Sequence, residues 1–311
     1  MAIEKPVNYA TEYSDALAQQ FPYVLNFGAL YSTPNNGRYR WVNAKTIEIP
    51  AITTTGRVDA SRDSISTAQR NYSNTWESKQ LTNERKWSTL VHPMDIDESG
   101  VVNTIANITQ VFNDEHKFPE MDSYTVSKIY TDWLTTTDPA TGSTRVADTT
   151  ELTVENVLST FDALMLKMDN ERVPANGRIL YCTHEVKTML KQAQGIQRSF
   201  DVQSGQSGIN RTISRIEEVE VIGVPATLML TAYNFTEGAV PTGTAKQINM
   251  FLVHPAAVIT PVKYEFSKLD APSAGSEGKY VYYEESHEDV FILNNKSGAI
   301  QFNITNTPQS I

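Results

Sequence analysis

The period of the hydrophobic pattern changes near residue 97 of the chain. Before this point, the stretch RYRWVNAKTIEIPAI places Ile47 and Ile49 on one face of an alternating segment, which is typical of a half-buried strand. Pro50 puts this strand at a sheet edge or marks its end, because proline has no amide hydrogen for a neighbouring strand. Mixed alternation resumes over residues 76–96. We therefore expect the two stretches to pair as a long antiparallel hairpin.

A polar insert, TTGRVDASRDSISTAQRNYSNTW (residues 54–76), lies between these two stretches. It contains too few apolar side chains to fold on itself, yet it ends in a tryptophan. As the tip of a hairpin with about fifteen residues per arm, it would reach about 50 Å at roughly 3.3 Å per residue. A compact domain does not need such a reach. We therefore expect the insert to pack on another copy of the chain.

From residue 97 onward, apolar residues recur every three to four positions, which is the spacing of one helix face. The pattern predicts a long helix that is broken or kinked near Pro119. The residues that carry it are Val101, Ile105, Ile108, Phe112, Val126, Ile129, Tyr130 and Trp133.

The remaining pattern alternates between helices and strands and predicts the α+β class. An N-terminal arm with a short helix near residues 11–20 comes first, and a threonine-rich connector (135–150) is the best candidate domain boundary. The other predicted elements are helices at 154–168 and 184–193, a loop at 194–211, and strands at 178–183, 219–230, 248–253, 280–285, 289–293 and 299–305, with a turn at 294–298.

Composition excludes several classes of protein. The chain of 311 residues is 40% hydrophobic, which is enough for a substantial core. No window approaches the roughly eighteen uninterrupted apolar residues of a membrane span, and the start lacks the pattern of a signal peptide. The single cysteine, Cys182, excludes a disulfide framework within the chain and fits a reducing cytosol. A formal charge of -10 argues against general attraction to nucleic acid or anionic lipid.

One stretch partly matches a calcium-binding loop. DIDESG places Asp95, Asp97, Ser99 and Gly100 at the first, third, fifth and sixth positions of such a loop. The twelfth position, which should supply a bidentate glutamate, is Ala106. We expect these residues instead to cap the long helix and to complement its dipole.

Two glycine-containing stretches also fail as functional motifs. GSEGKY (275–280) lacks a phosphate-binding loop's leading glycine, because Ser273 stands there, and has Tyr280 where a magnesium-binding hydroxyl belongs. It predicts a mobile turn. QSGQSG (203–208) lacks the spacing of a nucleophile elbow and predicts a flexible loop.

No constellation of residues predicts catalysis, cofactor binding or a metal site. Cys182 reads as a small buried hydrophobe, and the acidic run EESHED (284–289) as the solvated face of a strand pair. The histidines have no paired spacing and are expected to be structural; they are His92, His116, His184, His254 and His287.

Three of the four tryptophans flank the polar insert, in sequence too polar to bury them within one chain. Tryptophan and arginine are enriched at protein interfaces, where opposite charges set the docking register. The alternative is a surface hairpin whose tryptophans cover local core. The candidate interface residues are Trp41, Trp76 and Trp87 with the charged residues of the insert, Arg57, Asp59, Arg62, Asp63 and Arg70.

The order of these elements resembles the major capsid proteins of tailed bacteriophages, which have the Hong Kong 97-type fold. TLVHPMDIDESGVVNTIANITQVFNDEHKFPEMDSYTVSKIY resembles the end of that family's extended loop and its spine helix, and LTVENVLSTFDALMLKMDNERVPANGRILYCTHEV its axial domain. The resemblance implies an N-terminal arm (1–35), a strand with the extended loop hairpin (36–96), a spine helix and peripheral domain (97–150), an axial domain (151–245) and return strands completing the peripheral domain (246–311).

The resemblance also implies partners. Copies of the chain would form pentamers and hexamers, with the extended loop of one copy lying on the next, and the shell would enclose double-stranded DNA that it contacts weakly and non-specifically. Only about thirty-five residues precede the first strand, so we expect a separate scaffolding protein, together with a portal; decoration proteins are left open. The protein would reside in the virion after assembly in the host bacterial cytoplasm.

Some family members link lysine to asparagine between subunits. Lys79 or Lys86 with Asn294 or Asn295 would be the candidates here, but their spacing does not identify them, and we expect a non-covalent shell.

Three other functions remain open from the sequence. An encapsulin-like compartment would share the fold and enclose an enzyme. A tail-tube or other virion protein would assemble helically. A hydrolase or carbohydrate-binding module would need a spatially assembled site that the sequence does not reveal.

Overall fold

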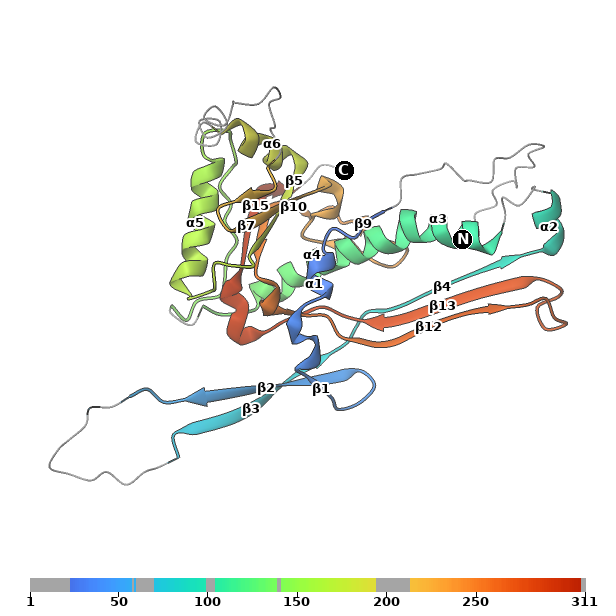
Figure 1. Ribbon diagram of the computed structural model, residues 1–311, viewed down its shortest axis with the longest axis horizontal. Helices are drawn as coiled ribbons and strands as arrows, with labels where there is room; N and C mark the ends of the chain where they lie inside the picture. The colour runs from blue at the N-terminus through green and yellow to red at the C-terminus, as the bar shows by residue number, and fades with distance from the viewer. Residues whose placement is uncertain are drawn as a thin grey trace, which may run out of the picture.

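A five-stranded mixed sheet in the strand order β15-β10-β5-β7-β6 forms the centre of the molecule (Figure 1). The computed structural model describes residues 23–57, 59, 70–98, 104–138, 141–193 and 213–308. The strands are β5 (Ile179–Thr183), β6 (Arg215–Ile216), β7 (Val219–Val224), β10 (Lys246–Val253) and β15 (Ile300–Pro308). β5 and β7 run parallel and are connected through α6 (His184–Gln192), whereas the other pairs are antiparallel.

Helices cover both faces of this sheet. Tyr181, Phe251 and Phe302 lie opposite one another in the strand register, so their rings share one face. Phe251 stacks on Phe302 with 4.7 Å between ring centroids, and Phe302 also contacts Trp133 of α4 (Phe118–Leu134). α5 (Val157–Asn170) and α6 lie on the opposite side (Figure 1). The prediction that residues 178–183 form a buried strand is confirmed, since every residue of β5 is buried.

A long helical segment leads away from this sheet. It consists of α3 (Ile105–Phe112), a π-helical turn at Asn113–Lys117 and α4, without interruption. The π turn lies just before Pro119, whose missing amide hydrogen and bulky ring disturb regular α-helical bonding. The predicted irregularity near Pro119 is therefore confirmed as a π turn within a continuous helix.

The predicted start of this helix at residue 97 is wrong. Asp95 and Asp97 lie in a separate short helix, α2 (Pro93–Glu98), so they do not cap the long helix. The cap is Thr104, whose Oγ1 accepts a hydrogen bond from the backbone N of Asn107 (3.4 Å). From the sequence alone, Thr104 was a weaker candidate for the N-cap than the acidic residues Asp95 and Asp97 before it.

A three-stranded antiparallel sheet runs alongside the long helix, in the order β12-β13-β4. Its strands are β4 (Glu84–Val91), β12 (Val262–Asp270) and β13 (Tyr280–Glu288). The hydrophobic pattern predicts the first part of β13, whereas the strand at residues 262–270 was not predicted. The turn between β12 and β13 contains residues 275–279 of the GSEGKY stretch, with Glu277 and Gly278 at positive φ, and Tyr280 begins β13.

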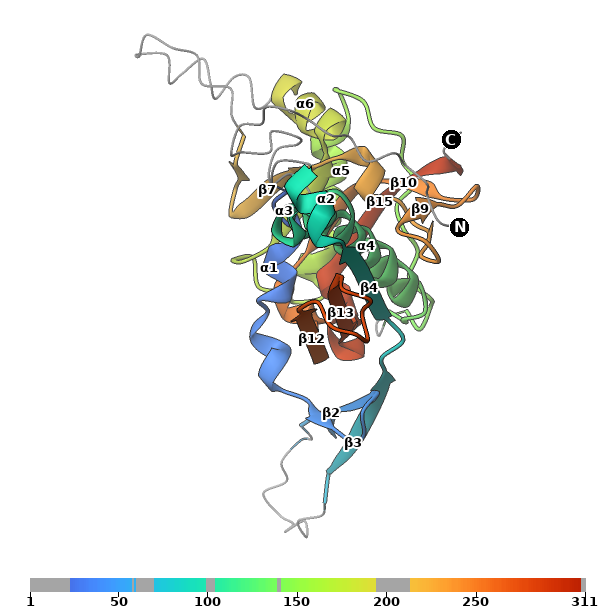
Figure 2. The same cartoon turned by 90° about the vertical axis from the view of Figure 1, so that its right-hand side faces the viewer.

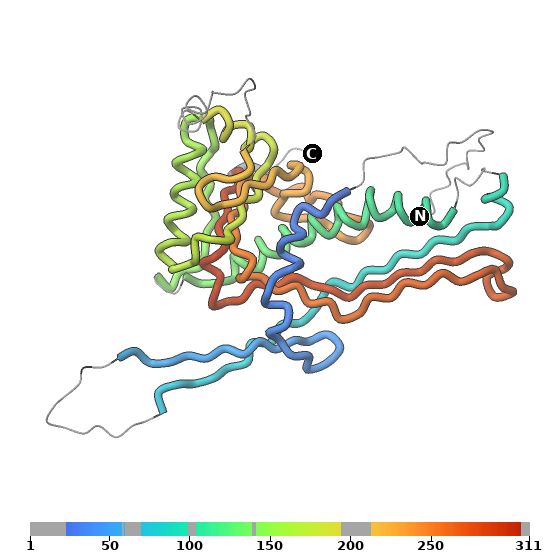
Figure 3. The backbone as a smooth tube through the Cα atoms, viewed as in Figure 1, coloured from blue at the N-terminus to red at the C-terminus, as the bar shows by residue number. Residues whose placement is uncertain are grey.

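The third sheet, β1-β2-β3, projects from the body as a hairpin (Figures 2 and 3). Its strands are β1 (Arg40–Trp41), β2 (Thr46–Thr54) and β3 (Tyr72–Gln80). β2 pairs with β3 from Thr46↔Gln80 to Thr54↔Tyr72. The predicted hairpin is confirmed, and Pro50 lies where β2 has β3 on one side only.

The paired strands of the hairpin, as far as the structure describes them, are shorter than the predicted arms. Each arm has 9 residues, which corresponds to about 30 Å at roughly 3.3 Å per residue, because the chain leaves the hairpin after Gln80 to enter the β12-β13-β4 sheet as β4. Leu81 marks this crossing and is buried with Ile47 and Phe291. The alternation over residues 76–96 predicts one continuous arm, whereas residues 84–91 pair with β13.

Short elements connect these parts. They are α1 (Gly28–Tyr31), β8 (Tyr233–Asn234), β9 (Val240–Pro241), β11 (Val258–Ile259), β14 (Phe291–Ile292) and the 3-10 helices at Pro34–Gly37, Ala226–Leu228, Pro255–Ala257 and Asn294–Ala299. The last of these replaces the turn expected at 294–298. The helix predicted at 11–20, the loop at 194–211 and the QSGQSG stretch lie outside the described residues.

Candidate inter-subunit surfaces

The two faces of the β2–β3 hairpin differ in how far the chain itself covers them. Opposite residues of an antiparallel pair share a face, and so do alternate residues along a strand. Ile47 and Ile49 share one face, where the body of the molecule buries both. The other face carries Pro50 opposite Trp76, with Ile52 one step nearer the tip. One face therefore anchors the hairpin, and the other points away from the anchor.

This second face, which we call the outer hairpin face, consists of Pro50, Ile52, Tyr72 and Trp76. The exposed fractions are 71% for Ile52, 55% for Tyr72 and 44% for Trp76. A contiguous exposed apolar surface is typical of a protein–protein contact, and an isolated hairpin gains little stability of its own. The outer hairpin face therefore fits a surface that another molecule covers.

A cation holds one side of the Trp76 ring in place. The guanidinium carbon of Arg40 lies 3.8 Å from the ring centroid, and Arg40 also forms an ion pair with Glu48 (2.8 Å). The contact restricts the indole ring, which would lower the entropic cost of burying it in an interface. Trp76 is thus an ordered aromatic side chain with 44% of its surface left open.

The described charged residues of the insert are exposed. Arg57 and Asp59 have exposed side chains, and Arg70 lies 4.9 Å from the ring centroid of Tyr72. Arg62 and Asp63 lie outside the described residues. The structure thus places Arg70 beside the outer hairpin face, and the pairing of these charges across an interface stays a prediction.

Trp87 and Trp41 have partners within the chain, contrary to the argument that no single chain could cover them. Trp87 stacks on Phe112 of α3, with 3.9 Å between ring centroids and 7° between planes. Trp41 contacts Tyr39 edge-on, and the Nζ of Lys263 lies 4.5 Å from its ring. The sequence could not reveal these contacts, because Phe112 and Lys263 lie far away along the chain.

A second exposed apolar surface lies on the β12-β13-β4 sheet. Tyr264 and Phe266 alternate along β12, stack at 6.1 Å, and are 45% and 38% exposed. Leu90 on β4 is 61% exposed. The register puts Phe266 opposite Glu285, whereas Tyr282, on the other face of β13, contacts Trp87. This surface was not predicted, although the alternation in VKYEFSKLD is a signal that could have revealed it.

The lysine and asparagine considered for a cross-link between subunits meet within one chain. Lys79 Nζ donates to Asn294 Oδ1 (3.3 Å) and forms an ion pair with Glu77 (2.7 Å). Lys86 lies on β4, opposite Glu285. Lys79 is therefore engaged by its own chain at the base of the hairpin.

The acidic run EESHED is not a solvated face, so that interpretation is wrong. Glu284 pairs with Lys117 (3.2 Å), and Asp289 is 2% exposed and accepts a hydrogen bond from the backbone N of Thr82 (2.8 Å). Burial raises the pKa of Glu288 above its usual range. The run ties β13 to the long helix and to the crossing after the hairpin.

Cys182 lies in the core, as predicted. It is fully buried on β5, and burial raises the pKa of its thiol to about 12. A thiol in this environment is a poor nucleophile at neutral pH. Among the described residues, no cluster of histidine, cysteine, aspartate or glutamate is arranged to hold a metal ion.

Within the described part of the chain, no helix has the length and apolar character needed to span a bilayer. No protein-family model matches the chain, and no curated protein does.

Solved structures of phage particles match nearly the whole chain. A chain of the bacteriophage PhiM1 mature capsid matches with a TM-score of 0.67 and 9% identity, over 96% of this chain and 92% of that one. A chain from Mycobacterium phage Che8 matches with a TM-score of 0.64 and 13% identity, over 96% and 97%. A chain of the capsid of cyanophage P-SCSP1u gives a TM-score of 0.62 and 12% identity, over 96% and 93%. The chain has the Hong Kong 97-type capsid fold that the sequence analysis expected.

Proposed function

We propose that this chain is the major capsid protein of a tailed bacteriophage and that it assembles through pentamers and hexamers into a closed shell around the phage DNA. The outer hairpin face carries this proposal. Its apolar residues project away from the chain's own core, so a neighbouring copy supplies the surface that covers them. Repeated contacts between two different surfaces of identical subunits close into rings, and rings into a shell.

Two further observations support the proposal. The same fold occurs in chains of the PhiM1 mature capsid and of the cyanophage P-SCSP1u capsid. The exposed apolar face of the β12-β13-β4 sheet gives the chain a second surface for contact, and a shell subunit needs more than one.

The division of the chain is part of this proposal. The hairpin serves as the extended loop, the long helix with the β12-β13-β4 sheet as the peripheral domain, and the five-stranded sheet with α5 and α6 as the axial domain. β10 and β15 hydrogen-bond within that five-stranded sheet, so the return segment 246–311 contributes to the axial domain as well as to the peripheral one. This assignment refines the boundary expected at residue 245.

The partners follow from the same proposal. The formal charge of -10 favours a container that holds DNA without gripping it, since carboxylates repel phosphates. A separate scaffolding protein and a portal complete the assembly, with the protein residing in the virion after assembly in the host cytoplasm. The chain acts as a structural subunit and carries out no chemical step.

Negative-stain electron microscopy of the purified protein, with sedimentation to give particle mass, tests this function. We expect closed shells, or rings of five or six subunits. A monomer would call for a second preparation in which the neighbouring genes are co-expressed, so that a scaffold is present. A persistent monomer in both preparations would contradict the proposal.

The contents and shape of the same particles distinguish this function from the alternatives. Packaged DNA supports a phage capsid, whereas a co-purifying enzyme inside the shell would indicate an encapsulin-like compartment. Helical tubes in place of closed particles would indicate a tail-tube protein.

A further inference from the structure

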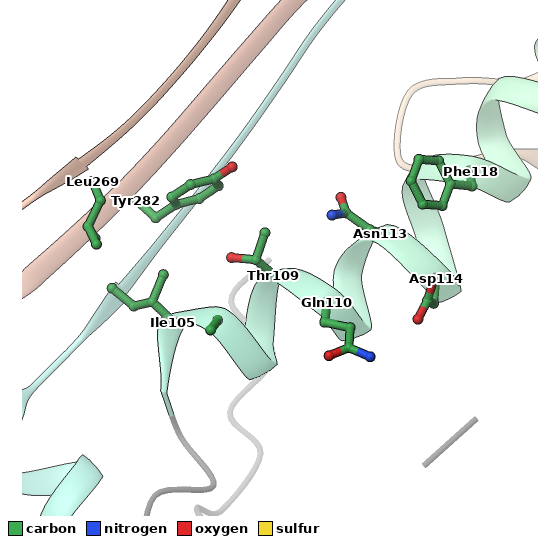
Figure 4. A pocket seen from close by; sticks show the side chains of 9 residues that line it. Ile105, Thr109, Gln110, Asn113, Asp114, Phe118, Leu269 and Tyr282 are labelled. Atoms are coloured by element: carbon green, nitrogen blue, oxygen red, sulfur yellow. The ribbon is translucent and has the colours of Figure 1, made fainter. Parts of the chain in front are cut away.

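A groove of about 620 Å³ lies between α3 and the strands β12 and β13 (Figure 4). Ile105, Leu269 and Tyr282 form its apolar end, and their side chains converge from the helix and from the two strands (Figure 4). Leu269 is 53% exposed. The groove is thus a preformed, mainly apolar surface that the described chain leaves open.

Two polar atoms in the wall of the groove lack partners. Thr109 Oγ1 and Asn113 Oδ1 are shielded from solvent and accept no hydrogen bond from any described residue. Leaving a buried acceptor unsatisfied costs about 1–3 kcal/mol. An occupant that brings hydrogen-bond donors as well as apolar side chains would remove this cost.

The described chain begins at the wall of this groove. The ring of Tyr23 stacks on Phe118 (6.5 Å between centroids), and its backbone N donates to Asp114 Oδ1 (3.3 Å). Phe118 and Asp114 both line the groove.

Asp122 holds this end of the chain in place. Its carboxylate is fully buried and accepts hydrogen bonds from Tyr23 OH (2.6 Å) and from the backbone N atoms of Asn26 (2.9 Å) and Phe27 (3.2 Å). The point where residues 1–22 join the described chain is therefore fixed beside the groove.

We propose that the segment preceding Tyr23, centred on residues 17–22, occupies this groove within the same chain. Leu17 supplies an apolar side chain for the apolar end, Phe21 supplies one nearer Phe118, and the amides of Gln19 and Gln20 supply donors for the two unpaired oxygens. The proposal concerns a single chain and does not depend on shell assembly.

The length of the chain allows this occupancy. The wall from Ile105 to Phe118 is about 20 Å long at roughly 1.5 Å per helical residue, and residues 1–22 would span about 33 Å even as a helix. An extended segment would need only about six residues to cover the same distance.

The hairpin of a second copy is the competing occupant. The chain's own hairpin cannot reach, because it projects from the opposite end of the molecule to α3 (Figures 1 and 3). A second copy must compete with a segment that is tethered to the groove wall, whose effective concentration is in the millimolar range. The tether therefore favours the N-terminal segment.

Thiol labelling tests the occupancy in the full-length chain. Ala106 lines the groove and is exposed, so Ala106→Cys reports on access, while buried Cys182 stays unreactive. We expect maleimide to label Ala106→Cys about tenfold more slowly than the same cysteine in a Leu17→Asp/Phe21→Asp chain, as for a groove filled nine-tenths of the time. Equal rates would overturn the proposal.

Two controls sharpen this test. Asp162→Cys, on the exposed side of α5, should react at the same rate in both backgrounds. A Leu17→Cys/Ala106→Cys chain, oxidised in dilute solution, should form a disulfide of monomer mass, because six extended residues before Tyr23 reach the Ile105 end of the groove. A product of dimer mass would assign the groove to a second copy of the chain. If no disulfide formed, the segment would not occupy the groove. Either result would overturn the proposal.

Discussion

The five-stranded sheet and the β2–β3 hairpin use similar side chains in opposite ways. Phe251 in the sheet is fully buried and stacks on Phe302, whereas Trp76 in the hairpin is 44% exposed and lies under the guanidinium of Arg40. The sheet is covered on both faces by helices of the same chain. Among the described residues of the hairpin, Ile47 and Ile49 at its base are the ones packed in buried clusters with the body of the chain. One region buries its aromatic side chains within the chain, whereas the other exposes an apolar face that we propose a second copy covers.

The largest loss of stability is expected in the sheet. Phe302→Ala removes a ring that Phe251, Trp133 and Tyr130 contact, so the free energy of unfolding should fall by about 3–5 kcal/mol. Urea denaturation of the monomer measures it. Leu166→Ala on exposed α5 is the control and should change it by less than about 0.5 kcal/mol. Similar values for the two variants would mean that this sheet is not the stable part.

An intermediate loss of stability is expected on mutation of Trp87, whose ring packs β4 against the long helix. Trp87→Ala removes a half-buried ring stacked on Phe112, so the free energy of unfolding should fall by about 2–3 kcal/mol. Trp87→Phe keeps an aromatic face and should recover most of this loss. If Trp87→Ala left stability unchanged and abolished assembly, Trp87 would belong with the hairpin as an interface residue.

A smaller loss of stability is expected at Trp76, together with a large effect on assembly. Trp76→Ala should lower the free energy of unfolding by less than about 1 kcal/mol, because the ring is exposed, yet it should prevent or delay particle formation. Thr75→Ala, on the opposite face of β3, should change neither quantity. Equal losses of folding and assembly in Trp76→Ala would show that the ring is not an interface anchor.

The smallest expected effect is a dependence of stability on pH, which arises from His254, directly after the end of β10. Burial lowers the pKa of His254, whose Nδ1 accepts a hydrogen bond from the backbone N of Ala256 (3.1 Å). Below a pH of about 6.5 the unfolded chain takes up this proton before the folded chain does, so stability is present above that pH and declines as pH falls. The melting temperature should drop between pH 7.5 and 5.5, and less so in His254→Asn. Identical profiles would assign the decline to other groups.

The sequence predicted the elements whose hydrophobic period is strong. The all-apolar run in β5, the amphipathic face of α5 and the alternation at Ile47 and Ile49 each produced the expected element, because their own residues determine which side is buried. The outer hairpin face was anticipated only in outline, from an apolar residue at the end of a polar insert.

The wrong predictions concern residues whose pairing or burial depends on contacts with residues far away along the chain. β4 leaves the hairpin because β13 offers it a better partner, and Trp87 is covered by Phe112 across that boundary. Asp289 is buried because Thr82 and Tyr124 satisfy its carboxylate, although the acidic run around it predicted exposure. Local pattern carries no information on such pairings.

The covering of the outer hairpin face by another copy is the central claim, and thiol labelling before and after assembly tests it most directly. Ile52→Cys lies on that face and Thr53→Cys on the opposite one; both positions are exposed in the single chain. Maleimide should label the two at similar rates in the monomer. In assembled particles, Ile52→Cys should be protected about tenfold more strongly than Thr53→Cys, in proportion to the time its surface is covered. Equal labelling of Ile52→Cys in monomers and particles would contradict the claim.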